Sequence, residues 1–336
     1  MINTDTTEGQ EIMLKEETFY ANPFQFSYNS LRKLMENPRK FYKEYILDER
    51  KKLYGSYLVE GSLIHFLLLE NNSVRLEDRY AVMNENMPSD NVMAIIDTIF
   101  KNDNSKDNLD EYGPEILEQL NERDFYSNIK DNDKRIGKIC DEKGREYFNF
   151  LKNKKDKIIV DVETLSNCIR MADIIRQNKD IMKLIGQIVD NRKLAVYNEH
   201  EIVIDKLKDY KFGIKGIVDN LVVDTDKKEI YINDFKTTSK SLADFPESVE
   251  KHMYWLQAAM YYILVRKQLK PSDDWKIMFS FIVVDKDDNV YQFKVNDSTM
   301  VVWLNKMAES LKKAEFHYNN KSYEMPYDFQ NNLVML

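Results

Sequence analysis

The chain has 336 residues, of which 43% are hydrophobic, and a formal net charge of −8. This length is enough to bury one large core or two small ones. The acidic balance argues against a protein that coats nucleic acid non-specifically, because neutralising phosphates requires clustered Lys and Arg. With Cys140 and Cys168 as its only cysteines, the chain cannot hold a four-cysteine metal site alone and has no disulfide framework.

The N-terminal segment is polar and acidic. We expect residues 1–22 to form a flexible tail, followed by a single domain over residues 23–336. The tail has none of the features of a secretory signal, and no apolar run in the sequence is long enough to span a membrane. The sequence therefore predicts a cytoplasmic protein without a membrane partner.

Two helices are expected near the start of the domain. Ser27 is a suitable N-cap for a helix with apolar residues at Leu31 and Leu34, and Pro38 ends that helix or opens the next one. A second helix, residues 61–70, is strongly apolar and contains His65. A lone histidine in such a helix is more often packed in a core than bound to a metal, so both interpretations stay open at this point.

Residues 72–165 are rich in Asn, Asp, Glu and Lys, yet apolar residues recur with helical spacing around Ile95 and Ile116. We expect this stretch to be a helical elaboration within the domain. Its helices would pack back on the core before a sheet begins near residue 195.

An apolar strand is predicted over residues 195–204, and it carries Glu199 and Glu201. Residues two apart share one face of a strand, so both carboxylates face the same way. Either could join a site built on the following hairpin. We favour Glu201, because it runs directly into the apolar residues 202–204.

The next two strands form a hairpin around the charged turn 224–228. Asp219 lies in the first strand, and Asp234 and Lys236 share a face of the second, so the two carboxylates can converge. Buried carboxylates repel each other unless a cation lies between them, and a hard divalent cation such as Mg²⁺ fits best. Lys236 would then hold a phosphate oxygen or orient an attacking water. The alternative is an ordinary amphipathic hairpin with a solvated Asp–Lys ion pair.

The C-terminal part alternates helices and strands. We predict a helix over 249–269, strands over 275–284 and 290–295, and a helix over 298–316. Gln257 and Tyr261 lie about one turn apart and face the same way. The order of elements is that of an α/β fold.

The hairpin motif resembles that of a known family. Residues 216–219 (G-I-V-D) and 234–236 (D-F-K) resemble the core of the PD-(D/E)XK nucleases. Residues 61–65 (G-S-L-I-H) and 257–261 (Q-A-A-M-Y) resemble the G-x-x-x-H and Q-x-x-x-Y helices of the RecB-like and RecE-like exonuclease branch. The serine-rich segment 26–31 is similar to the helix that opens many members. Four features in the order of the family are far more specific than any one of them.

The resemblance implies a mixed central β-sheet flanked by helices, with one or two bound Mg²⁺ or Mn²⁺ ions. It assigns as metal ligands His65, Asp219, Asp234 and the carbonyl oxygen of Phe235. It implies that an acidic residue at Glu201 assists and that Lys236 orients water. It assigns Gln257 and Tyr261 as positioners of the phosphate or the scissile strand.

The function implied by the resemblance is that of a metal-dependent deoxyribonuclease similar to exonuclease VIII. Such an enzyme digests linear double-stranded DNA processively from an end in phage-type recombination. A homo-oligomeric ring and a single-strand annealing protein as partner are implied as well. Two alternatives stay open: a catalytically inactive DNA-binding or nuclease-regulating protein on the same fold, and a structure-specific endonuclease.

Overall fold

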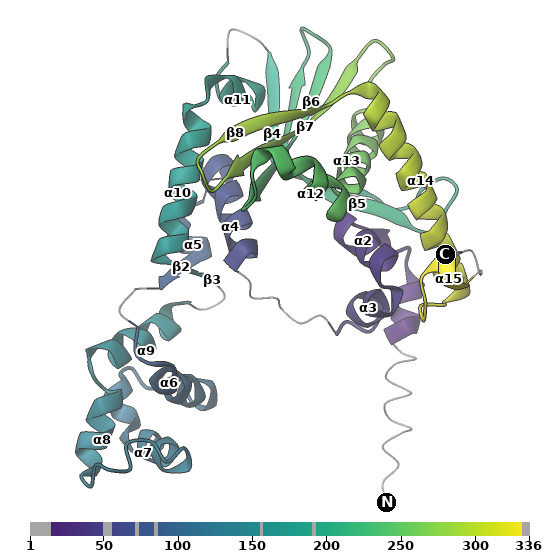
Figure 1. The fold of residues 1–336 in the computed structure, drawn as a ribbon. Coiled ribbons are helices and arrows are strands. Elements are labelled where there is room, and N and C mark those ends of the chain that lie inside the picture. Colours follow the sequence, from purple (N-terminus) through teal and green to yellow (C-terminus); the bar gives the residue numbers. More distant parts are fainter. Residues whose placement is uncertain are drawn as a thin grey trace, which may run out of the picture. The chain divides into compact units, whose positions relative to one another are not determined.

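The computed structural model describes residues 15–49, 56–70, 74–83, 87–154, 157–189 and 193–330. The chain forms two compact units (Figure 1). The sheet unit consists of Met1–Tyr54 and Met171–Leu336, and the helical unit consists of Gly55–Arg170. The stretch 72–165 lies wholly within the helical unit. Within the described ranges, no helix is both long and apolar enough to cross a membrane.

A six-stranded sheet forms the centre of the sheet unit. Its strands are β1 (Gln25–Phe26), β4 (Leu194–Ile204), β5 (Gly213–Asp224), β6 (Glu229–Thr238), β7 (Lys276–Asp285) and β8 (Val290–Val295). Strands β1, β5, β6, β7 and β8 follow one another across the sheet, and β4 pairs with β5. The β1–β5 and β6–β7 pairs are parallel, and the other pairs are antiparallel. This mixed sheet, flanked by helices, confirms the predicted α/β fold class (Figure 1).

Strands β5 and β6 form the predicted hairpin and then separate. Their ladder runs from the turn to the pair Asn220 and Asn233 and stops there. The start of β5 pairs instead with β1, on the same edge that β6 occupies further along, because β4 fills the opposite edge. We call this divergence of β5 and β6 the fork. Asp219 and Asp234 are the first residues of the two strands beyond it.

Helices flank the sheet within the same unit. They are α2 (Tyr28–Glu36), α3 (Pro38–Phe41), α11 (Lys179–Leu184), α12 (Phe245–Lys251), α13 (Tyr254–Leu269), α14 (Asp297–Asn320) and α15 (Tyr327–Gln330). Helix α13 approaches β5 closely at Gly216, where an added Cβ would lie 2.8 Å from Cε1 of Tyr261. The single helix predicted over 249–269 is wrong at its start. Met253 has a left-handed φ of 54°, which separates α12 from α13 because such a residue cannot continue a right-handed helix.

The segment that opens the domain follows the prediction. Ser27 caps α2 and accepts a hydrogen bond from the N–H of Ser30, and Pro38 opens α3, where its missing N–H is tolerated. Residues 15–21, within the segment expected to form the tail, are helical. The Tyr20 hydroxyl lies 2.7 Å from that of Tyr323, so this part of the tail packs on the sheet unit.

The helical unit has a hydrophobic core of its own. Its elements are α4 (Ser56–His65), α5 (Leu76–Arg79), β2 (Tyr80–Met83), α6 (Asp90–Asn102), α7 (Gly113–Glu122), α8 (Asn132–Ile139), α9 (Glu142–Lys154) and β3 (Ile158–Asp161), and α10 (Val162–Gln177) begins in it. Ile95 and Ile116 are fully buried on α6 and α7, which confirms the helical spacing predicted there. The parallel pairing of β2 with β3 is a feature that the sequence analysis missed.

Candidate active site

Asp219 holds the two strands together just beyond the fork. Its side chain is buried, and Oδ2 accepts a 2.8 Å hydrogen bond from the backbone N–H of Phe235 on β6. A buried N–H needs an acceptor. Where β5 and β6 are paired, backbone carbonyls of β5 accept from β6; beyond the fork, the Asp219 carboxylate takes this role for the N–H of Phe235. The local geometry of β6 therefore depends on Asp219.

Asp234 and Lys236 form an ion pair on β6, between Oδ2 and Nζ. Asp234 is fully buried. Burial alone lowers the pKa of Lys236, but the charges of Asp234 and Asp219 more than offset this and raise it above its usual value. The Lys236 ammonium also lies 5.0 Å from the centre of the Tyr254 ring, a cation–π contact. The structure thus brings Asp219, Asp234 and Lys236 together, as the sequence analysis expected.

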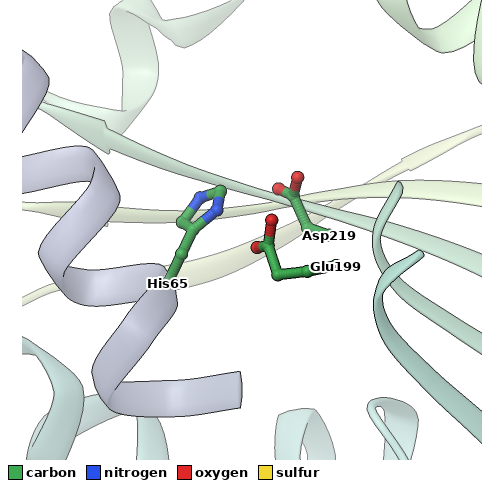
Figure 2. A group of neighbouring side chains, drawn as sticks. All are labelled: His65, Glu199 and Asp219. Atoms are coloured by element: carbon green, nitrogen blue, oxygen red, sulfur yellow. The ribbon is translucent and has the colours of Figure 1, made fainter. Parts of the chain in front are cut away.

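The register of β4 on β5 distinguishes the two glutamates that the sequence offered. Glu201 pairs with Ile217 and is exposed, whereas Glu199 lies between the pairs Asn198–Asn220 and His200–Val218, at the level of Asp219. Carboxylate oxygens of Glu199 and Asp219 lie within 4.8 Å of each other (Figure 2). Glu199 has a left-handed φ of 46°, a conformation that costs a non-glycine residue about 1–3 kcal/mol and that clusters at functional sites. The structure therefore brings Glu199, rather than the favoured Glu201, beside Asp219.

Helix α13 contributes the predicted pair Gln257 and Tyr261. Nε2 of Gln257 donates a 3.0 Å hydrogen bond to the Tyr261 hydroxyl, and both side chains are buried. Burial raises the pKa of Tyr261 well above its usual value, and the charges of Asp219 and Asp234 add to the effect. Tyr261 is therefore close to both carboxylates. Among the described residues, the buried Oε1 of Gln257 has no hydrogen-bond donor.

A row of asparagines crosses the opposite face of the sheet, one residue away from the carboxylates. Nδ2 of Asn233 donates to Oδ1 of Asn220, and Nδ2 of Asn220 donates to Oδ1 of Asn198, both at 2.8 Å. Nδ2 of Asn220 also donates to the carbonyl of Ile185 at 3.2 Å. We call Asn198, Asn220 and Asn233 the amide row. The sequence analysis missed it, although each asparagine directly precedes or follows an acidic residue of the site.

The donor set fits a hard divalent cation. Asp219, Asp234 and Glu199 supply three carboxylates against the single ammonium of Lys236, so the cluster has an excess of negative charge and of hydrogen-bond acceptors. Mg²⁺ and Mn²⁺ prefer such oxygen ligands. The third side chain in Figure 2 is His65, the last residue of α4, which belongs to the helical unit.

Comparison with known proteins identifies the class. A model of the PD-(D/E)XK nuclease superfamily matches residues 25–324, so the chain belongs to this superfamily, as predicted. The protein is thus a hydrolase of the nuclease class.

A search of curated proteins finds no match. Among solved structures, a chain from Eubacterium rectale described as a "putative exonuclease" aligns with 11% identity and a TM-score of 0.47, covering 100% of this chain and 95% of that one. At this TM-score the likeness carries no argument about function.

Proposed function

We propose that the protein is a metal-dependent deoxyribonuclease of the RecB-like and RecE-like branch, acting as an exonuclease on the ends of linear double-stranded DNA. One observation carries the proposal: two buried carboxylates and an ion-paired lysine lie at the point where β5 and β6 separate. Burying these charges is costly, and a protein without chemistry has little reason to retain them.

The metal ligands would be Asp219, Asp234 and Glu199, together with the Phe235 carbonyl and His65. Glu199 and Asp219 have carboxylate oxygens within 4.8 Å of each other and offer donors suited to Mg²⁺ or Mn²⁺, and the resemblance adds His65 to them. Such an ion, when bound, lowers the pKa of a coordinated water and neutralises charge that develops on the phosphate. Replacement of His65 by Ala should weaken Mn²⁺ binding; unchanged affinity would assign this histidine to packing.

The remaining residues act on the water and the phosphate. Lys236 is held charged by Asp234, so its ammonium can donate a hydrogen bond to the attacking water or to a phosphate oxygen. The buried Oε1 of Gln257 can accept a hydrogen bond and thereby orient that water or the scissile strand. Tyr261 holds the Gln257 amide in place from the next helical turn. Attack on the phosphodiester would leave a 5′-phosphate and a 3′-hydroxyl.

The finer assignments come from the resemblance. We propose processive digestion in phage-type recombination, by a ring of identical chains that leaves a single strand for an annealing protein. These assignments support a choice of substrate for the first assay, namely duplex DNA with free ends. Closed circular DNA offers no ends, so it separates an exonuclease from an endonuclease.

The test incubates the purified protein with linear or closed circular duplex DNA, in Mg²⁺ or chelator, and follows acid-soluble nucleotides. The proposal expects release from linear DNA alone and only with Mg²⁺. Cleavage of the circular DNA would show that the protein is an endonuclease and not an exonuclease. Binding of duplex DNA without cleavage, in Mg²⁺ and in Mn²⁺, would overturn the proposal in favour of an inactive DNA-binding protein.

A further inference from the structure

Helix α2 presents Tyr28 and Arg32 to the junction between α12 and α13. The Tyr28 hydroxyl donates a 2.5 Å hydrogen bond to the carbonyl of His252, the residue before the left-handed Met253. Nη1 of Arg32 donates to the Tyr28 hydroxyl at 3.2 Å and to the same carbonyl at 3.5 Å. Nε of Arg32 lies 3.2 Å from a carboxylate oxygen of Glu36. The guanidinium is thus fixed in one orientation while its side chain stays 29% exposed.

This cluster is continuous with the candidate active site. Tyr254, two residues after His252, carries the ammonium of Lys236 against its ring, at 5.0 Å. Burial raises the pKa of Tyr254, and the charges of both Lys236 and Arg32 act to lower it. The Tyr254 hydroxyl is therefore within electrostatic reach of the catalytic lysine on one side and of Arg32 on the other.

Three cations, Arg32, Lys240 and Lys251, act on His252 in a chain whose net charge is −8, and two of them have an acidic partner, Glu36 for Arg32 and Glu247 for Lys240. Burial lowers the pKa of His252. The positive charges of Arg32, Lys251 and Lys240 lower this pKa further, and the charge of Glu36 opposes them. Lys240 and Lys251 are exposed. A concentration of cations beside an excess of buried carboxylates suits a substrate whose phosphates repeat along a chain.

We propose that Arg32, held in place by Tyr28 and assisted by the hydroxyl of Tyr254, binds a backbone phosphate of the DNA strand next to the one that is cleaved. Nη2 of Arg32 donates no hydrogen bond to a described residue, and a guanidinium fixed on its other side can direct this group at a phosphate oxygen without further ordering. This inference rests on the proposed nuclease function and deepens it by adding a binding residue outside the metal ligands.

A purely structural role for Arg32 predicts different behaviour. If Arg32 only fastened α2 to the α12–α13 junction, its loss would lower the melting temperature and leave the electrostatics of DNA binding unchanged. If it binds a phosphate, its loss removes one of the contacts that release counterions, and the salt dependence of binding becomes weaker.

The experiment measures the equilibrium binding of a fluorescein-labelled linear duplex by anisotropy, in chelator and over a range of salt concentrations. We expect Arg32→Gln to reduce the slope of log K against log salt by about 0.9, the value for one phosphate contact on duplex DNA. Arg32→Lys keeps the charge and should keep most of the slope. Arg39→Gln, an exposed arginine on α3, is the matched control and should behave as the wild type.

A wild-type slope in Arg32→Gln, with or without a lower melting temperature, would overturn the inference. The two proposals fail separately. Cleavage of linear DNA by the wild type with an unchanged slope in Arg32→Gln rejects the phosphate site alone. A reduced slope in Arg32→Gln, together with a wild type that never cleaves, rejects the nuclease assignment alone.

Discussion

Two rows of polar residues cross the same strands on opposite faces of the sheet. They are equally buried, but they differ in how their polar groups are satisfied. Asn220 and Asn233 are 0% and 1% exposed, and Asp219 and Asp234 are 5% and 0% exposed. An amide carries a donor and an acceptor, so the members of the amide row bond to one another across the strands, and among their buried side-chain atoms only Oδ1 of Asn233 lacks a donor within the described residues. Carboxylates only accept hydrogen bonds, so Asp219 and Asp234, which we call the carboxylate row, depend on Lys236, on a backbone N–H and on a cation.

The amide row stabilises the strand register, whereas the carboxylate row carries the chemistry. A slip of one residue would turn every side chain to the other face, and the bonds of the amide row stabilise the register that brings Asp219 and Asp234 together just beyond the fork. The carboxylate row retains the charge excess that binds a metal. On β5 and β6, the asparagines therefore fix the strand register, and the aspartates next to them form the reactive centre.

The largest expected effect is on cleavage. Asp234→Asn keeps the size of the side chain and removes its charge, so we expect linear DNA cleavage in Mg²⁺ to fall about 10²–10³-fold, as for loss of a major electrostatic group. Lys236→Ala should have a similar effect. Asp273→Asn, an exposed aspartate before β7, is the control. Full activity in Lys236→Ala would contradict the mechanism.

The amide row can be broken in two stages. Asn220→Val leaves buried donors and acceptors of its neighbours unpaired, which should lower the free energy of unfolding by about 1–3 kcal/mol. The double variant Asn220→Val with Asn233→Val removes both partners of the bond between these two residues, so part of this stability should return, while Asn198 and the Ile185 carbonyl still lose the Asn220 donor. If the row also fixes the register for the carboxylates, the double variant still binds Mn²⁺ more weakly than the wild type. Recovery of wild-type Mn²⁺ affinity would reduce the row to packing.

Substitution of Gly216 tests whether the close packing of α13 on β5 is needed. In Gly216→Ala the new Cβ would lie 2.8 Å from Tyr261 Cε1 and 3.0 Å from Leu264 Cδ1, so the Tyr261 ring or the helix that carries it must shift. We expect a loss of about 1–3 kcal/mol, typical of overpacking, with a lower kcat because Gln257 moves with Tyr261. Gly137→Ala on α8 has no atom within 4 Å of the new Cβ and serves as the control. Equal melting temperatures for the two variants would contradict this close packing.

His317 offers the smallest effect and a reference for a buried polar group satisfied by the chain itself. Its Nδ1 lies 2.5 Å from the carbonyl of Ser322, and burial lowers its pKa below the usual value. Because the unfolded state then binds the proton more readily, stability is complete above about pH 6.5 and falls as the pH drops below it. Urea unfolding at pH 7.5 and 5.5 should show this decrease in the wild type and a smaller one in His317→Phe. An equal decrease in both would assign it to other groups.

Local patterns predicted the hairpin, the face shared by Asp234 and Lys236, and the helical pair Gln257 and Tyr261, because each depends on spacing within one or two neighbouring elements. Glu199 could not be chosen over Glu201 in this way. Both share a face of β4, and only the pairing of β4 with β5 decides which one meets Asp219.

Other features also depended on contacts distant in sequence. The fork requires β1 to pair with the start of β5 and so to replace β6 there. The break before α13 depends on a left-handed Met253, which no local preference of methionine predicts. The amide row became visible only once three strands were in register.

A calorimetric titration of Mn²⁺ into the wild type, Asp219→Asn and Asp234→Asn tests whether the metal binds at the fork, with thermal melts to confirm that each protein is folded. If the carboxylate row holds the metal, the wild type binds Mn²⁺ and each folded variant loses most of that affinity. Wild-type Mn²⁺ affinity in both folded variants would contradict a metal site at the fork.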